Sequence, residues 1–343
     1  MEYYAGIDVS LDLSSVCVVD GTGKIVSESK VSSDPDALAK HCADIGLPIA
    51  RIGLEAGPMS QWLREGLIQA GFDVVLLETR HVKAALSAMT IKTDRKDARG
   101  IAHMLRMGWY RPVHAKSGDA QALRTLLAGR KQLQSKLIEL EHSIRGLLRG
   151  YGLKVGQVSR GRFDARIREL VDGNDALSRV VDALLLARSA LWAEFAKLHR
   201  EMLRIARTDP VCRRLMTAPG VGAAVALTYR AAVDDPSRFA KSRTVGAYLG
   251  LTPRKYQSGE TDIDGGISKV GDGATRTVLF EAAHVMLTRP TKSSPLKRWA
   301  LNVAKRRGMK RAKVALARKL AIVLHRIWVD ATEFRWSNNP AAA

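Results

Sequence analysis

Residues 3–9 read Tyr-Tyr-Ala-Gly-Ile-Asp-Val, an apolar run that contains a single carboxylate, Asp8. Aspartate is disfavoured inside a strand, and a carboxylate at the end of a buried strand is costly unless it binds a cation or finds donors. A second apolar run, residues 49–54, ends at Glu55 and is followed by Gly57 and Pro58. The sequence therefore predicts two carboxylates at strand ends, where the functional sites of α/β proteins are common.

Two further acids, Asp94 and Asp97, are three residues apart just before an apolar helical pattern. Residues with this spacing share one helix face, so their like charges repel unless a cation lies between them. An equally good explanation is structural: Thr93 or Asp94 caps the helix and Asp97 completes a capping-box-like pairing. If these two acids converge with Asp8 and Glu55, the four form an all-oxygen site suited to Mg²⁺ or Mn²⁺.

Short apolar segments alternate with helical spacing in the first third of the chain. Five segments are rich in Val, Ile, Leu and Tyr and are predicted to be strands: 3–9, 15–20, 25–30, 49–54 and 73–78. Helical spacing predicts helices over 35–45 and 59–70. The order βββ-α-β-α-β-α is that of an RNase H-like sheet. We therefore expect an α/β metal-binding domain over residues 1–115.

Leucines recur at helical spacing from residue 118 to about 207, with charged residues between them. This pattern predicts two long amphipathic helices joined near 150–161, a helical hairpin or coiled coil over residues 116–208. Each helix offers more apolar surface than a lone hairpin buries. We therefore expect self-association into a dimer or tetramer.

The formal charge of the chain is +21, and no acidic residue occurs between residue 282 and Asp330. Such a stretch repels itself unless a polyanion neutralises it, although basic residues also simply solubilise helices. The residues expected to bind nucleic acid here are Lys305, Arg306, Arg307, Lys310 and Arg311. An acidic pocket in a very basic chain indicates metal-dependent chemistry on nucleic acid phosphates.

Gly220 and Gly222 flank Val221 in a turn that resembles a helix-hairpin-helix motif. Two glycines allow the backbone to approach a phosphate at a helix start, while an ordinary turn between helices is the alternative. We expect a mainly α domain over residues 209–335 and a disordered tail over 336–343.

Together these blocks resemble the DEDD transposases of insertion sequence family 110, which are close to the Piv DNA invertases. The resemblance covers nearly the whole chain and is carried by residues 6–9, 54–57, 92–98, 218–222, 247–254, 256–259 and 267–271. The usual Gly-Thr-Tyr after the glutamate is replaced by Gly57, Pro58 and Met59. This departure leaves the acids intact and changes the local contacts to nucleic acid.

The resemblance implies a RuvC-type RNase H-like domain, a coiled coil and a transposase domain with a serine nucleophile. It assigns the four acids to a metal site and Ser258 to the nucleophile, a serine that no other feature of the sequence singles out. Attack by this serine leaves a covalent phosphoserine bond. The cations expected near the phosphate are Arg254, Lys255, Lys269 and Arg276.

The same resemblance implies partners. Members of this family act as homo-oligomers with a noncoding bridge RNA that pairs with both donor and target DNA. Base pairing with the RNA then selects the DNA sequences, and the protein recognises the nucleic acid backbone and the shape of the duplex. Residues from one subunit or from two could complete the active site.

Three other functions remain open. A plain metal-dependent nuclease or junction resolvase uses water in place of serine. A sugar kinase of the actin-like class has a first phosphate loop similar to residues 4–9, but the positive charge and the lack of later glycine motifs oppose it. A nonenzymatic RNA-binding protein needs no acidic site.

The three cysteines are far apart and form no CxxC pair, which argues against a zinc site or a disulfide framework. No signal peptide and no apolar run long enough for a membrane span are visible. We expect a cytoplasmic, nucleoid-associated bacterial protein that contacts no membrane.

Overall fold

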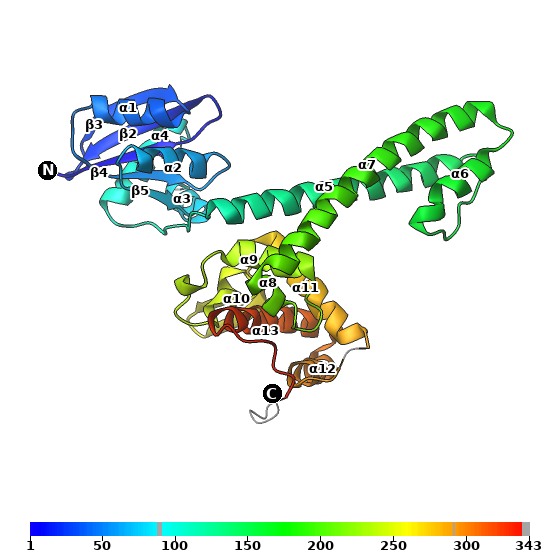
Figure 1. Ribbon diagram of the computed structural model, residues 1–343. Helices are drawn as coiled ribbons and strands as arrows, with labels where there is room; N and C mark the ends of the chain where they lie inside the picture. The colour runs from blue at the N-terminus through cyan, green and yellow to red at the C-terminus, as the bar shows by residue number, and fades with distance from the viewer. Residues whose placement is uncertain (88–90, 291, 338–343) are drawn as a thin grey trace. The chain divides into compact units, whose positions relative to one another are not determined.

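The computed structural model describes residues 1–87, 91–290 and 292–337 (Figure 1). The chain divides into two compact units, Met1–Lys116 and Ser117–Ala343. Among the helices of the described residues, none combines the length and the apolar character that crossing a membrane requires. The finer domain boundaries at 115 and 208 stay a prediction.

The first unit is built on a five-stranded sheet with the order β3-β2-β1-β4-β5. The strands are β1 (Tyr3–Asp8), β2 (Leu13–Asp20), β3 (Ile25–Ser32), β4 (Ile49–Glu55) and β5 (Val74–Leu77). β1, β4 and β5 run parallel, whereas β2 is antiparallel to both β1 and β3. The predicted strands are confirmed within a few residues, and this mixed order agrees with the predicted RNase H-like sheet.

Helices cover both faces of this sheet (Figure 1). They are α1 (Pro35–Asp44), α2 (Ser60–Gln69), α3 (Thr79–Leu86) and α4 (Asp94–Arg106). Side chains alternate along β2, so that Val16 and Val18 face the core beneath α1 and α2, while Cys17 and Val19 face α4. The α4 side is lined by small residues, which lets this helix lie close to the strands.

The close approach of α4 to β1 occurs at Gly6. A Cβ atom on this glycine would lie 2.2 Å from the carbonyl oxygen of Ala98 and 2.4 Å from the backbone nitrogen of Ala102. Ala98 and Ala102 are both fully buried. The position of α4 over the sheet is therefore set by the absence of a side chain two residues before Asp8.

The second unit begins with the predicted pair of long helices, α5 (Gly118–Arg149) and α7 (Asp175–Thr208), which pack against each other. The segment predicted to start the second long helix is a separate helix, α6 (Phe163–Val171), preceded by the short η1 (Arg160–Arg162). The prediction of one uninterrupted helix was wrong there. Gly173 takes a left-handed conformation with φ of 78°, and the side chain of Asn174 caps α7 by accepting from the Leu177 N–H at 3.0 Å.

The pair formed by α5 and α7 has its own apolar core near the α6 end, centred on Ile144, Phe163 and Leu185. Arg188 is also buried there, with 5 % of its surface exposed, and it pairs with Glu141 at 2.8 Å and Asp164 at 2.7 Å. Pairing compensates the cost of burying this guanidinium. Whether these helices form a coiled coil in the assembled protein stays a prediction.

The rest of the second unit is mainly helical, as predicted. It contains α8 (Pro210–Leu215), α9 (Ala223–Val233), η2 (Pro236–Arg238), α10 (Thr244–Tyr248), α11 (Gly273–Thr288), α12 (Pro295–Arg307) and α13 (Met309–Val329). Its core includes the buried Tyr229, whose hydroxyl donates to the Ala321 carbonyl at 2.7 Å. Of the tail predicted over 336–343, residues 338–343 lie outside the described part.

One antiparallel hairpin interrupts this helical region: β6 (Pro253–Ser258) and β7 (Thr261–Ile267). No strand was predicted for residues 253–260, and the structure makes most of this segment a strand. Every residue of β6 is exposed. A strand that buries neither face lacks the alternation of polar and apolar residues that identifies strands in a sequence.

The contact at Gly6 gives a first prediction. Gly6→Ala should push α4 away from β1 and destabilise the first unit by about 1–3 kcal/mol, because the added methyl group overlaps backbone atoms that cannot yield locally. Hydrogen exchange followed by mass spectrometry should show faster exchange in peptides from β1 and α4.

Gly21→Ala is the matched control, since the nearest atom to its added Cβ lies at 3.8 Å. Unchanged exchange in Gly6→Ala would mean that α4 does not depend on this close approach.

Candidate active site

Asp8 and Glu55 lie side by side at one edge of the sheet. Each is the last residue of its strand, β1 or β4, and these strands are parallel neighbours in which Ile7 pairs with Leu54. Both carboxylates are half-buried. The prediction of two acids at the carboxyl ends of buried strands is therefore correct.

The N-terminus of α4 brings Asp94 and Asp97 to the same edge. The cap of this helix is Thr93, whose side chain accepts from the Lys96 N–H at 3.3 Å. The two aspartates occupy the first turn, and Ala98, the residue after Asp97, is the one that lies on Gly6. The structural explanation is thus correct for Thr93, and the carboxylates of Asp94 and Asp97 are not needed for the cap.

The charges of the four acids act on one another. Burial raises the pKa of Asp8, the neighbouring carboxylates of Asp97, Asp94 and Glu55 add to the effect in that order, and together they bring it to about 6. Burial also raises the pKa of Glu55, where the charge of Asp97 adds to the effect and a hydrogen bond from Thr79 opposes it. The fold holds four acids close enough for each strand-end carboxylate to be harder to ionise.

The local positive charge is small. Lys92 lies 3.6 Å from Asp97 and opposes the pKa increase at both Asp8 and Glu55, but its side chain is 86 % exposed. Solvent weakens the effect of such an exposed ammonium group on its neighbours. This lysine therefore offsets little of the repulsion among the four carboxyl groups.

An excess of carboxylate oxygen with no nitrogen or sulfur donor fits a hard divalent cation such as Mg²⁺ or Mn²⁺. Within residues 1–87, 91–290 and 292–337, no group of three or more acidic, histidine or cysteine side chains has the geometry to hold a metal ion as it stands. Metal binding by Asp8, Glu55, Asp94 and Asp97 thus stays a prediction, supported by their mutual electrostatic effects.

Glu28 binds two arginines of α4, the helix that carries Asp94 and Asp97, and its role was not predicted from the sequence. This β3 residue accepts from Arg95 Nε at 2.7 Å and from Arg99 Nη2 at 2.7 Å. The hydrogen bonds from Arg99, joined by those from Arg95, lower the pKa of Glu28 to about 2. The spacing of the two arginines, one helical turn apart, was the only available signal, because it places both on one face of α4.

Ser258 belongs to the second unit. It is the final residue of β6, pairs with Thr261 across the hairpin, and is exposed beside the turn at Gly259. Arg254 and Tyr256 alternate with it along β6 and so share its face. The serine is thus presented at the tip of a two-stranded hairpin.

The four cations predicted near the phosphate have different surroundings. Lys255 pairs with Asp262 of the opposite strand at 3.1 Å, and Arg254 contacts the Ser268 carbonyl at 3.5 Å. Lys269 is exposed in a left-handed conformation with φ of 56°. Arg276 donates from Nη1 to three backbone carbonyls, at distances of 2.9–3.1 Å, so that nitrogen stabilises the loop after β7.

The predicted glycine turn lies between α8 and α9. Gly220 has a φ of 82°, and a Cβ there would lie 2.4 Å from the Ala282 carbonyl oxygen, so packing against α11 requires glycine. Gly222 is exposed and precedes α9 as its N-cap residue. The first glycine therefore has a structural reason, and only the second lies open to a ligand.

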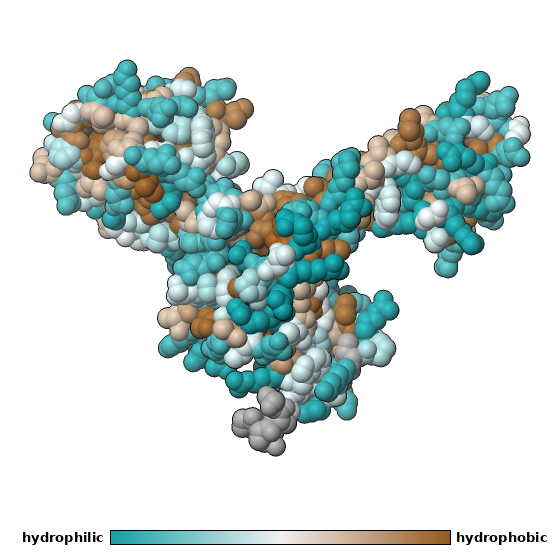
Figure 2. All heavy atoms as spheres, viewed as in Figure 1, coloured by the Kyte–Doolittle hydropathy of each residue, from teal (hydrophilic) through white to brown (hydrophobic). Residues whose placement is uncertain are grey.

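The predicted basic surface lies at the junction of α12 and α13. Lys305, Arg306 and Arg307 form the last turn of α12, while Lys310 and Arg311 begin α13, and all five are exposed. Figure 2 shows the visible face of the second unit as mostly hydrophilic, with apolar patches between. Nucleic acid binding by these residues stays a prediction.

Comparisons with known proteins match both units. A family model described as a transposase matches residues 5–153, and one described as the transposase IS116/IS110/IS902 family matches residues 212–299. The transposase for insertion sequence element IS1111A of Coxiella burnetii is 31 % identical, over 93 % of this chain and 87 % of its own length. A probable family 20 transposase of Pseudomonas aeruginosa is 30 % identical, over 81 % of this chain and 83 % of its own.

Among solved structures, Thermus thermophilus RuvC in complex with a Holliday junction substrate is similar to 33 % of this chain and matches over 100 % of its own length. The identity is 17 % and the TM-score is 0.25.

Asp8 gives the prediction that follows from this site. Its pKa is raised in the folded chain from the ordinary 3.8 to about 6, so the folded state loses stability relative to an uncharged residue as pH rises through this window. Without divalent cations at pH 7.5, Asp8→Asn should be more stable than the native protein by about 1 kcal/mol, after allowing for solvent screening at a half-buried carboxylate. The difference should vanish below about pH 4.

Thermal unfolding between pH 4 and 8, with EDTA or with Mg²⁺, measures both effects. Added Mg²⁺ should stabilise the native protein and not the variant. Asp12→Asn, at an exposed position of the same unit, is the matched control. A loss of stability in Asp8→Asn at pH 7.5 in EDTA would contradict a strained acidic cluster.

Proposed function

The chain belongs to the IS116/IS110/IS902 family of transposases, and from this premise we propose that it cuts and rejoins DNA strands by metal-assisted phosphoryl transfer. The observation that carries the proposal is the placement of Asp8 and Glu55 at the ends of neighbouring parallel strands, where the charges of Asp94 and Asp97 reach them, in a chain with a formal charge of +21. Carboxylates held this close to one another are suited to bind a metal cation, and the positive charge of the rest of the chain is suited to bind a phosphate.

Asp8, Glu55, Asp94 and Asp97 hold the metal in this proposal. When bound, Mg²⁺ or Mn²⁺ polarises the scissile phosphate and neutralises negative charge that builds up on its oxygens. Glu28 is a positioning residue, because its contacts with Arg95 and Arg99 fix the helix that carries two of the acids. These contacts also keep the guanidinium groups of Arg95 and Arg99 paired with Glu28 and not with the acidic cluster.

Ser258 is the proposed nucleophile. Its Oγ forms a bond to phosphorus, one phosphorus–oxygen bond to deoxyribose breaks, the serine proton is lost, and the departing oxygen takes up a proton to become a free hydroxyl. The resulting phosphoserine conserves the bond energy, so a second DNA end can displace the serine without ATP. Exposure of Ser258 at the hairpin tip, beside the small Gly259, supports access by a DNA strand.

The proposed partners are donor DNA, target DNA and a noncoding bridge RNA that pairs with both, in a homo-oligomer of two or four chains. The exposed basic surface formed by Lys305, Arg306, Arg307, Lys310 and Arg311 suits phosphate backbones and carries no sequence preference of its own. We place the protein in the bacterial cytoplasm, associated with the nucleoid.

A second candidate uses water in place of Ser258, as in a RuvC-like nuclease or resolvase. Its specific support is that all four acids lie within Met1–Lys116, together with Glu28 and the two arginines that it binds. Metal-dependent hydrolysis needs no hydroxyl from elsewhere in the chain. The two candidates differ in whether protein becomes attached to DNA.

Ser258→Ala should abolish strand transfer and the covalent protein–DNA adduct on a denaturing gel, while DNA binding stays within about twofold. Asp8→Ala should also abolish the adduct, because the phosphate is no longer activated. Thr261→Val, which removes the neighbouring exposed hydroxyl across the hairpin, should keep both activities. Intact strand cleavage by Ser258→Ala would establish the water mechanism.

The guide is tested by sequencing RNA that copurifies with the native protein from bacteria carrying the flanking DNA of its gene. We expect one noncoding RNA with separate segments complementary to donor and target. A variant with Lys305, Arg306 and Arg307 replaced by Gln should retain less of it, because phosphate contacts are lost. Recovery of unselected cellular RNA alone would remove the guide from the account.

A further inference from the structure

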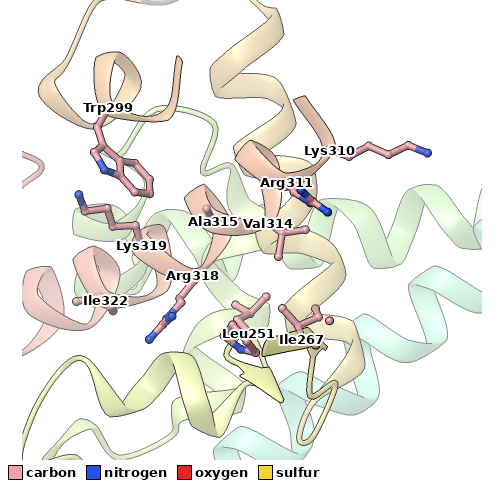
Figure 3. Close-up of a pocket in the computed structure, with 13 residues that line it drawn as sticks. Leu251, Ile267, Trp299, Lys310, Arg311, Val314, Ala315, Arg318, Lys319 and Ile322 are labelled. Carbon is pink, nitrogen blue, oxygen red and sulfur yellow. The ribbon is translucent and has the colours of Figure 1, made fainter. Parts of the chain in front are cut away.

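A pocket of about 640 Å³ opens in the second unit between α12, α13 and the base of the β6–β7 hairpin (Figure 3). Its volume lies in the range that holds a small organic ligand. The apolar part of its lining comprises Leu251, Ile267, Val314, Ala315 and Ile322. None of these residues belongs to the acidic site or was predicted to bind a ligand.

The polar part of the lining is entirely cationic: Lys310, Arg311, Arg318 and Lys319. All four are exposed, and they lie on both sides of Val314 and Ala315 (Figure 3). Among the described residues, none of the four forms an ion pair with an acid, although other surface cations of the chain do. The lining thus combines an apolar surface with unneutralised positive charge.

An aromatic side chain closes one end. Trp299 of α12 faces the pocket, and the ammonium group of Lys319 lies 3.9 Å from the centre of its ring (Figure 3). Indole rings and cations are the groups on which proteins stack and neutralise single-stranded nucleic acids. A neutral lipid or metabolite would use the apolar surface and leave four cations without a counterion.

We propose that this pocket binds one unstacked nucleotide of a single-stranded segment, with the base on the apolar surface and the flanking phosphates against the cations. The proposal rests on the proposed function to the extent that this chain acts on nucleic acid. It adds a site that holds a single strand by shape and stacking. This site shares Lys310 and Arg311 with the proposed basic surface, whose other residues contact the phosphate backbone without regard to strand form.

The hairpin links the pocket to the proposed nucleophile. β6 starts at Pro253 in the pocket wall and ends at Ser258, which an extended strand places roughly 17 Å further on. Gly265 and Gly266 of β7 also line the pocket and add no side chain to its wall. A strand seated in the pocket can therefore follow the hairpin towards its tip.

Photochemical cross-linking tests the location with the full-length native protein. Single-stranded DNA and single-stranded RNA oligonucleotides carrying 5-iodouracil serve as separate probes, with duplex DNA as a third. We expect cross-links to Trp299 or to the peptide over residues 310–322 from at least one single-stranded probe. Labelling by DNA alone, RNA alone or both tells which strand occupies the pocket, and cross-links found only elsewhere would overturn the proposal.

Ala315→Phe tests the pocket without changing charge, because the ring occupies the space intended for the base. Affinity for single strands should fall about tenfold, while duplex affinity stays unchanged. Ala274→Phe, at an exposed position of α11 away from the pocket, is the control. Equal losses for single strands and duplex, or no loss in a folded variant, would contradict a nucleotide pocket.

Charge removal gives an independent test if Ala315→Phe does not fold. Arg318→Gln removes one charge from the pocket lining. Lys313→Gln removes one charge from the same helix at a position outside the pocket. Only Arg318→Gln should weaken single-strand binding more than duplex binding, and equal effects of the two variants would overturn the proposal. Cross-links in the pocket without any DNA cutting or joining would refute the proposed function and leave this site standing.

Discussion

The acidic site depends on how closely α4 lies on β1. Gly6 has no side chain, and the backbone of Ala98 and Ala102 occupies the space where a Cβ would be. This contact fixes the start of α4 one turn away, so Asp94 and Asp97 come to the edge of the sheet where β1 and β4 end in Asp8 and Glu55. A helix displaced outward by a single methyl group would separate the two pairs of acids.

Holding these acids together is unfavourable without a ligand, because their negative charges repel. Contacts elsewhere in the fold keep α4 in place against this repulsion. Glu28 binds Arg95 and Arg99 and ties the first two turns of α4 to β3. Because both guanidinium groups are occupied there, they contribute little neutralisation to the acids beside them. Lys92, whose charge opposes the pKa increase at both strand-end acids, is largely exposed. In the proposed function, these acids bind a divalent cation, and the exposed basic side chains of α12 and α13 contact phosphates.

The sequence predicts the parts of this site that depend on local pattern. Asp8 and Glu55 stand out because each ends an apolar run, and the order of strands and helices follows from short periodic segments. Glu28 could not be found this way, because its partners are 67 and 71 positions away and only the folded sheet brings them together. The strand that carries Ser258 buries neither face, so no alternation marks it.

The same limits explain the other differences. The break between α6 and α7 depends on a left-handed Gly173 and a cap from Asn174, two residues that a leucine pattern passes over. Gly220 resembles a phosphate-binding turn, yet α11 packs against it and gives it a structural reason. The pocket beside Trp299 joins three segments whose residues are ordinary in isolation.

Iron-directed cleavage tests the central claim most directly, namely that four acids from three segments form one divalent-cation site. Fe²⁺ is substituted for Mg²⁺, and ascorbate with peroxide generates hydroxyl radicals that cut the chain next to the bound ion. The account predicts cuts near residues 8, 55 and 94–97 together, competed by Mg²⁺ and absent from a variant with Asp94→Asn and Asp97→Asn. Cuts at one of these segments alone, or an unchanged pattern in the variant, would contradict it.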